Sequence, residues 1–378
     1  MSPLSIVDSG ILYINPDPAH RHVSAFFPTV VQLGESEFLC LYQRGDGMYA
    51  TNSTLGRLRS VDGGATWQDE SVLRDASPDD RHWSLHCTFL SGMSDGRLVV
   101  FAMRADRSDP ARPMFSETGG ITRIEPLLFE SYDGGRTWAP PRVTTLGKDL
   151  VVSPAQSIIE LASGRWLAVV DEWRAYHDPR PYEPRMLGFF SDDQGRTWSD
   201  PTVIADKSRG GRGYWHGRPI RLRDGGLFSL FWTADMSDVA RGPVNLPIHA
   251  AAADAAGQQW ETPYSTGIPG QTNCVTELPD GRLAAIYTDR EGARPGFLIV
   301  LSHDRGRTWN LDDRLRVWDA TGWTQIGVSS PDRYPRSHDT IAFGAPSLMT
   351  TQQGELLASW WCTFASLTHL RWARVVAG

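Results

Sequence analysis

A short segment of this chain carries a tyrosine, a histidine and an arginine at alternating positions. Tyr214, His216 and Arg218 are each separated by one residue. If the segment is a β-strand, the three side chains lie on one face, because successive side chains of a strand point to opposite sides. A histidine or tyrosine base beside a guanidinium suits proton abstraction next to a carboxylate. One hypothesis is therefore elimination on a uronate.

Carboxyl groups suited to hydrolysis follow apolar segments elsewhere in the chain. Asp46, Glu172 and Asp289 each lie near the end of such a segment, and Asp235 holds an equivalent place. Two carboxyls that flank a glycosidic bond can serve as acid and base, or as acid and nucleophile. These residues favour glycoside hydrolysis, which is the first prediction, with elimination as the alternative.

Glu172 is the most interesting of these carboxyls. It follows the apolar run 167–170 and is flanked by Trp173 and Arg174, a setting in which its pKa could be tuned. A strand-end ion pair between Glu172 and Arg174 is the structural alternative.

Basic side chains at the same places form a set that could bind an anionic sugar. The planar guanidinium fork matches a carboxylate, so several arginines facing one funnel favour a sialic or uronic acid. Any single arginine could equally pair with a neighbouring Asp in a solvated loop. The set is Arg21, Arg44, Arg104, Arg174, Arg218, Arg290, His86 and His338.

The elements that must position these groups are repeated. The pattern S-x-D-x-G-x-T-W occurs at Ser60–Trp67, Ser131–Trp138, Ser191–Trp198 and Ser302–Trp309. The interval before the last copy is about twice the others, which predicts a degenerate copy ending at Trp260, with its Asp slipped to Asp254. Within each copy, Asp and Gly suit a tight turn, so these Asp residues are structural rather than catalytic.

A second repeated element is an apolar hairpin with Gly in its turn. Six such hairpins give six units. The last unit lacks a box, and the N-terminal segment 11–15 can supply its missing outer strand. We therefore predict an all-β fold, a six-bladed β-propeller of four-stranded antiparallel blades that forms one domain over residues 1–378. The hairpins span 26–44, 86–104, 153–174, 217–235, 272–290 and 344–362.

The box resembles the Asp-box, or BNR, repeats of the sialidase (neuraminidase) superfamily. The resemblance implies a six-bladed propeller whose boxes lie on turns between the third and fourth strands of a blade, away from the active face, and a sialidase-like glycosidase activity. Arg44 and Asp46 match the family's arginine and catalytic aspartate.

Other family positions are occupied differently. Phe26 stands where the first carboxylate-binding arginine would be, Thr272 stands at the glutamate, and Arg290 lies near a second arginine. The segment Gly344–Ser347 lacks the nucleophilic tyrosine. The chain is thus expected to diverge from standard exo-sialidases.

A third hypothesis is a non-catalytic propeller that binds a glycan. Tryptophan side chains can stack on sugar rings, although many in a propeller serve packing. The candidates are Trp83, Trp173, Trp215, Trp232 and Trp361.

Composition excludes other classes. The formal net charge of −7 disfavours a nucleic-acid partner. No stretch of about 18 apolar residues predicts a membrane span. No signal peptide is visible in the N-terminal residues, so the expected location is cytoplasmic.

The four cysteines lack zinc-ligand spacing, so we expect buried thiols, no metal and no cofactor. The expected partner is a glycan.

Overall fold

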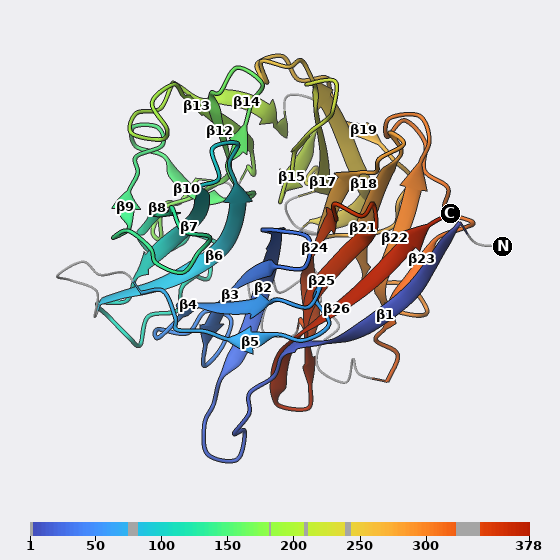
Figure 1. The fold of residues 1–378 in the computed structure, drawn as a ribbon. Helices are drawn as coiled ribbons and strands as arrows, with labels where there is room; N and C mark the ends of the chain where they lie inside the picture. The colour runs from blue at the N-terminus through green and yellow to red at the C-terminus, as the bar shows by residue number, and fades with distance from the viewer. Residues whose placement is uncertain (1–2, 75–81, 181–182, 208–210, 239–242, 323–340) are drawn as a thin grey trace.

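The computed structural model describes residues 3–74, 82–180, 183–207, 211–238, 243–322 and 341–378. Over these ranges the chain forms six antiparallel sheets arranged around a common centre (Figure 1). The predicted all-β, six-bladed propeller is confirmed. His338 lies outside the described residues.

The first three blades follow one another along the chain. Blade I contains β2 (Ser24–Gln32), β3 (Phe38–Gly45), β4 (Thr54–Ser60) and β5 (Gln68–Asp69). Blade II contains β6 (Trp83–Gly92), β7 (Leu98–Asp106), β8 (Ile124–Ser131) and β9 (Arg142–Val143). Blade III contains β10 (Val151–Pro154), β11 (Ile159–Glu160), β12 (Trp166–Trp173), β13 (Met186–Ser191) and β14 (Thr202–Ala205).

The remaining blades complete the ring. Blade IV contains β15 (Arg212–Trp215), β16 (Ile220–Arg221), β17 (Leu227–Asp235), β18 (Val244–Ala253) and β19 (Tyr264–Ser265). Blade V contains β20 (Asn273–Glu277), β21 (Leu283–Asp289), β22 (Gly296–Ser302) and β23 (Leu315–Asp319). Blade VI contains β24 (Phe343–Thr350), β25 (Leu356–Phe364), β26 (Leu367–Ala377) and β1 (Leu4–Tyr13).

The N-terminal strand closes the last blade, as predicted. β1 pairs antiparallel with β26 from Leu4↔Ala377 to Tyr13↔Leu370, and the two strands lie side by side in Figure 1. Closure in this way joins the first and last parts of the chain in one sheet and limits the exposed edges of the ring.

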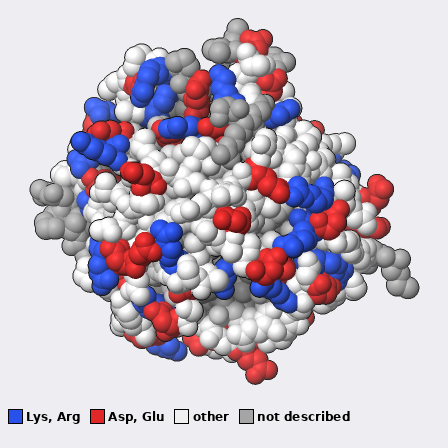
Figure 2. All heavy atoms as spheres, turned by 90° about the horizontal axis from the view of Figure 1, so that it is seen from above, with Lys and Arg blue, Asp and Glu red and all other residues white. Residues whose placement is uncertain are grey.

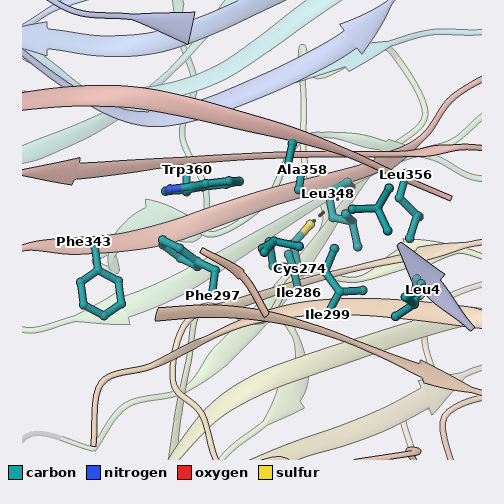
Figure 3. Packing of buried hydrophobic residues seen from close by; sticks show 14 of the residues in the cluster. Leu4, Cys274, Ile286, Phe297, Ile299, Phe343, Leu348, Leu356, Ala358 and Trp360 are labelled. Carbon is teal, nitrogen blue, oxygen red and sulfur yellow. Dashed lines mark hydrogen bonds between the residues drawn. The ribbon is translucent and has the colours of Figure 1, made fainter. Parts of the chain in front are cut away.

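Each blade packs against the next through apolar faces. Between blades V and VI, Phe297 lies 5.3 Å from both Phe343 and Trp360, measured between ring centroids (Figure 3). Leu4 of the closing strand joins the same cluster and is 2% exposed. Blade-to-blade burial of this kind supplies the main hydrophobic stabilisation of the ring.

The Asp boxes form hydrogen-bonded turns. In the first box, Asp62 accepts from the backbone N–H of Thr66 at 2.9 Å and from its hydroxyl at 2.5 Å, and Ser60 donates to Asp62 at 2.7 Å. Trp67 Nε1 then donates to the carbonyl of Gly64 at 3.0 Å. The Asp62 carboxylate is therefore hydrogen-bonded within its own turn and has a structural role, as the repeat pattern predicted.

The degenerate copy forms a similar turn. Asp254 accepts from the backbone N–H groups of Gln258 and Gln259, both at 3.0 Å, and Trp260 Nε1 donates to the carbonyl of Gly257 at 2.9 Å. A slip of one residue is tolerated because the turn needs only a carboxylate facing successive N–H groups.

Side chains of the preceding blade hold several boxes in place. Arg57 on β4 donates to the carbonyl of Gly135 at 2.7 Å, and Arg142 on β9 donates to that of Gly195. Tyr264 on β19 donates to that of Gly306 at 3.2 Å. These bonds join neighbouring blades in addition to the apolar contacts.

The surface carries both signs of charge intermixed, as Figure 2 shows for one side of the molecule. Among the described residues no helix is long and apolar enough to cross a bilayer. The four cysteines are free thiols, and three of them, Cys40, Cys274 and Cys362, are buried.

The buried Arg57 clamp gives a first prediction. Its Nε also donates to the Ser71 carbonyl at 2.6 Å, so Arg57→Ala removes two hydrogen bonds from a buried guanidinium, while Gly135 O keeps the bond from Trp138 Nε1. We expect the free energy of unfolding to fall by about 2–4 kcal/mol, since a hydrogen bond to a charged group contributes about 1.5–3 kcal/mol and the Ser71 end is exposed. Urea titration measures it. Arg21→Ala, which removes a side chain that is 78% exposed, is the control. Equal stability of both variants would contradict the clamp.

The first Asp box gives a prediction about pH. Hydrogen bonds from Thr66 and Ser60 lower the pKa of Asp62 to about 2. Because the folded-state pKa is depressed, the carboxylate stabilises the fold above its ordinary pKa, and this contribution is lost as pH falls towards 2. We expect Asp62→Asn to be less stable than the wild type between pH 6 and 8, by a constant amount, and this difference to shrink below about pH 4. Urea midpoints measured at each pH test this, and a difference unchanged at low pH would refute it.

Candidate functional site

A cavity lies at the centre of the ring, where the innermost strands of the blades converge. Every blade contributes to its lining, which explains why no single stretch of sequence defines the site. One lining residue from each of blades I to VI, in order, is Phe27, Cys87, Asp171, His216, Thr272 and Ala345.

Four of these lining residues have an unusual backbone conformation. Phe27, Cys87, His216 and Ala345 have φ values of 53°, 54°, 50° and 42°. The pairing register shifts at the first, second and fourth, and His216 lies in the break between β15 and β16. Bulges of this kind re-aim a side chain, and a positive φ at a non-glycine residue is typical of functional sites.

A buried carboxylate holds the histidine of the cavity. Asp171, on β12, is 2% exposed, and its Oδ1 accepts from the backbone N–H of His216 at 3.0 Å. Its Oδ2 lies 3.4 Å from Nδ1 of the same residue. The second ring nitrogen, Nε2, is the one not directed at Asp171. This arrangement orients an imidazole for proton transfer.

An aromatic ring supports the other side of the imidazole. Trp232 stacks on His216 with ring centroids 5.8 Å apart and planes at 20°. Trp232 Nε1 donates to Asn245 Oδ1 at 2.7 Å, and the Asn245 amide in turn donates to Glu291. Asp171 and Glu291 are the carboxylates that the described chain contributes to the cavity lining.

Two arginines of the cavity bind backbone carbonyls. Arg218, which is 6% exposed, donates to Pro346 O at 2.6 Å, and its guanidinium lies over the Phe89 ring. Arg290 donates to Phe343 O at 3.0 Å, and burial lowers its pKa to about 10, so it remains protonated at neutral pH. Among the described residues neither arginine has a carboxylate at ion-pair distance. A bound anion would supply the missing negative charge.

His86 also lines the cavity. It is 1% exposed and its Nε2 is hydrogen-bonded to Ser84 Oγ at 2.7 Å. Burial, together with the nearby Arg107, lowers its pKa to about 3, so the ring is neutral at physiological pH.

Of the site residues predicted from sequence, the structure brings His86, His216, Arg218 and Arg290 together in this cavity. Tyr214 packs inside blade IV, 5.8 Å from the Phe231 ring, rather than on the cavity. The predicted grouping of Tyr214 with His216 fails because the backbone changes conformation at His216.

The predicted carboxyls lie elsewhere. Glu172 is on the other face of β12 from Asp171 and pairs with Arg185 instead of Arg174. Asp46 is exposed, and Asp289 accepts from the Gly292 N–H at 2.7 Å in a turn. Asp235 likewise accepts from a turn N–H, that of Ser237.

Four predicted arginines have partners outside the cavity lining. Arg44 pairs with Asp69 at 2.9 Å, and Arg104 pairs with Glu125 at 2.6 Å and lies over Trp83. Arg174 donates to the carbonyl of Arg180, and Arg21 is largely exposed. The tryptophans of the cavity are Trp173, Trp215, Trp232 and Trp361.

Asp171, Asn245 and Glu291 line the cavity but were not among the site residues predicted from sequence. One signal for Asp171 was available, because it is two residues from Trp173 and therefore shares its strand face, whereas Glu172 does not. Asn245 and Glu291 carry no comparable pattern, since they come from separate strand ends.

Some of the positions compared with sialidases line the cavity, namely Thr272, Arg290 and Ala345 of the segment Gly344–Ser347, whereas Phe26, Arg44 and Asp46 do not. Ala345 N donates to Thr272 Oγ1 at 3.2 Å. Phe27 lines the cavity, while Phe26 packs on Trp361. Within the described ranges, no group of three or more His, Cys, Asp or Glu could hold a metal ion.

The fold and the central cavity define a six-bladed BNR propeller. Residues 58–356 match the family of the BNR repeat-like domain, and the chain belongs to that family.

Individual relatives are more distant. The chain is 26% identical over 219 residues to a sialidase of Micromonospora viridifaciens, a match that covers 52% of this chain and 32% of that protein, so the match takes in only about a third of the relative's length. A protein of unknown function from Dyadobacter fermentans shares the fold over the full length of both chains, with a TM-score of 0.76 and 18% identity. An α-L-arabinanase of Penicillium chrysogenum has a TM-score of 0.66 and 13% identity, with 98% of each chain covered.

Proposed function

We propose that this protein is a glycoside hydrolase that cleaves a glycan containing an anionic sugar, a sialic or uronic acid, in the central cavity. The observation that carries the proposal is the buried Asp171, which accepts a hydrogen bond from the backbone N–H of His216 and whose second carboxylate oxygen lies 3.4 Å from Nδ1 of the imidazole. The same cavity holds two arginines that have no carboxylate partner among the described residues.

His216 is the proton-transferring group in this proposal. Asp171 orients the ring, which leaves Nε2 to exchange a proton with the glycosidic oxygen or with the attacking water. Trp232 is a positioning residue that acts through His216, because it stacks on the imidazole and is itself held by Asn245.

The carboxyl groups available to this chemistry are Asp171 and Glu291. Asp46, Glu172 and Asp289, the carboxyls favoured by the sequence, are occupied or exposed away from the cavity lining. In this proposal, Asp171 therefore takes part in acid/base catalysis through His216, and Glu291 is the second acidic group.

The similarities to a sialidase and to an α-L-arabinanase support glycoside hydrolysis as the reaction class. The anionic substrate is supported by Arg218 and Arg290, since a guanidinium binds a carboxylate through two parallel hydrogen bonds.

Elimination is the second candidate. An imidazole base close to an arginine suits removal of a proton next to a uronate carboxylate, and His216 and Arg218 line the same cavity. A propeller that only binds glycans is the remaining alternative.

A product assay on sialosides, uronides and neutral glycosides separates the three. Hydrolysis releases a sugar that carries oxygen from labelled water, elimination gives an unsaturated uronate detected by its absorbance, and binding alone gives no product. We expect labelled sugar from an anionic glycoside. We also expect His216→Ala and Asp171→Asn each to lower kcat/KM by about 100-fold or more.

The chain offers a matched control for these variants. His20 forms a similar pair with Asp17 at 2.9 Å, but its side chain is 80% exposed. His20→Ala should leave kcat/KM within about twofold of the wild type. Full activity of both His216→Ala and Asp171→Asn would remove the proposed role of the pair.

The two cavity arginines give a separate prediction. We expect D-glucuronic acid or N-acetylneuraminic acid to bind more tightly than D-glucose in calorimetric titrations. Arg218→Met and Arg290→Met should each weaken binding of the preferred acid by about tenfold or more, because a charge-assisted hydrogen bond contributes roughly 1.5–3 kcal/mol. Arg44→Met, which breaks the pair with Asp69, is the control. Equal affinity for acids and glucose would argue against an anionic substrate.

A further inference from the structure

One side of the central cavity is apolar. Its residues come from the loop after β3, from β7 and from the loop between β7 and β8, and we call them the apolar wall. They are Met48, Tyr49, Met103, Met114, Phe115 and Ile121. Three of the six, Met103, Met114 and Ile121, are at most 4% exposed.

Aromatic rings make the wall continuous with the rest of the site. Phe115 meets Tyr49 edge to face, with ring centroids 5.0 Å apart and planes at 77°. The ring of Phe115 also lies near that of Trp173, with centroids 5.4 Å apart. Trp173 lies two residues after Asp171 on β12, so a group seated on the wall lies beside the Asp171–His216 pair.

The loop that carries much of the wall is fixed in place. Its two sides are joined by the Thr122 N–H, which donates to Met114 O at 2.9 Å. The Ile121 N–H donates to Arg174 O at 2.9 Å, which ties the loop to blade III. Gly120 permits this approach, because a Cβ there would lie 2.4 Å from Ala175 O. A preformed surface costs little conformational entropy when a ligand binds.

The chemistry of the wall selects an uncharged group. Methionine side chains adapt to irregular apolar surfaces and contact aromatic rings favourably. Edge-to-face packing by Phe115 and Tyr49 is the geometry that a further aromatic ring can extend. His86, whose ring lies 6.4 Å from that of Tyr49, is neutral and so brings no charge to this side of the cavity.

We infer that the apolar wall binds an aromatic aglycone, so that the substrates include glycosides whose leaving group is an uncharged aromatic alcohol. This inference rests on the proposed function, because it places the sugar at His216 and the leaving group on Phe115 and its neighbours. Arg218 and Arg290 then bind the anionic sugar. The charged end of the substrate contacts these arginines, and its aromatic end contacts the apolar wall.

The test has two arms. The first measures binding of phenol by calorimetry, with inositol as a polar ring of similar size, and requires no catalysis. We expect phenol to bind the wild type, inositol not to bind, and Phe115→Ala to weaken phenol binding by about fivefold or more. The second compares KM for the phenyl and methyl glycosides of one accepted sugar. We expect the phenyl glycoside to have a KM about tenfold lower, and this ratio to fall to about two in Phe115→Ala.

Two further variants keep the test decisive. Phe115→Leu retains an apolar side chain and should fold even where Phe115→Ala does not, with an intermediate KM ratio. Tyr132→Ala removes an aromatic ring that is 71% exposed in an Asp-box turn and should leave both readouts unchanged.

The outcomes separate this inference from the proposed function. Phenol binding that depends on Phe115, without cleavage of any glycoside, would uphold the wall and refute the hydrolase. Cleavage with equal KM for phenyl and methyl glycosides, and no phenol binding, would overturn the inference and leave the hydrolase standing.

Discussion

The centre of this propeller depends on a buried carboxylate. Asp171 is removed from water, so its charge must be met by hydrogen-bond donors, and the donor that reaches it comes from the next blade. That hydrogen bond holds the backbone of His216 against β12, at a residue with a positive φ. The orientation of the imidazole and the contact of Trp232 with it follow from the same constraint.

The architecture was accessible from the sequence because it is repeated. Asp62, Asp133, Asp193 and Asp304 recur in one pattern, and the local hydrogen bonds of an Asp turn are the same in every copy. Even the degenerate turn at Asp254 kept enough of the pattern to be found. Closure by β1 followed from a missing strand in the last unit.

The site was accessible only in part. His86, His216, Arg218 and Arg290 were found because polar groups at the ends of inner strands face the axis. Glu172 was favoured because of its neighbours Trp173 and Arg174, although Asp171 is the carboxyl that shares a strand face with Trp173. Tyr214 and His216 were expected on one face, but the break between β15 and β16 changes the alternation. Asn245 and Glu291 become part of the cavity through tertiary contacts between blades. Such contacts produce no periodic pattern in the sequence.

The pairing of β1 with β26 also bears on how the chain reaches its folded state. Strands within blades I to V find partners that are close in sequence, whereas Leu4 must wait for Ala377. On a ribosome, β1 is made before the other described strands and finds its partner after them, and its pairing with β26 closes a very long loop. Until β1 pairs with β26, the apolar residues of β24 and β25 in this cluster lack their contact with Leu4. Blades I to V can thus form in succession, whereas closure of the ring by β1 follows the synthesis of β26.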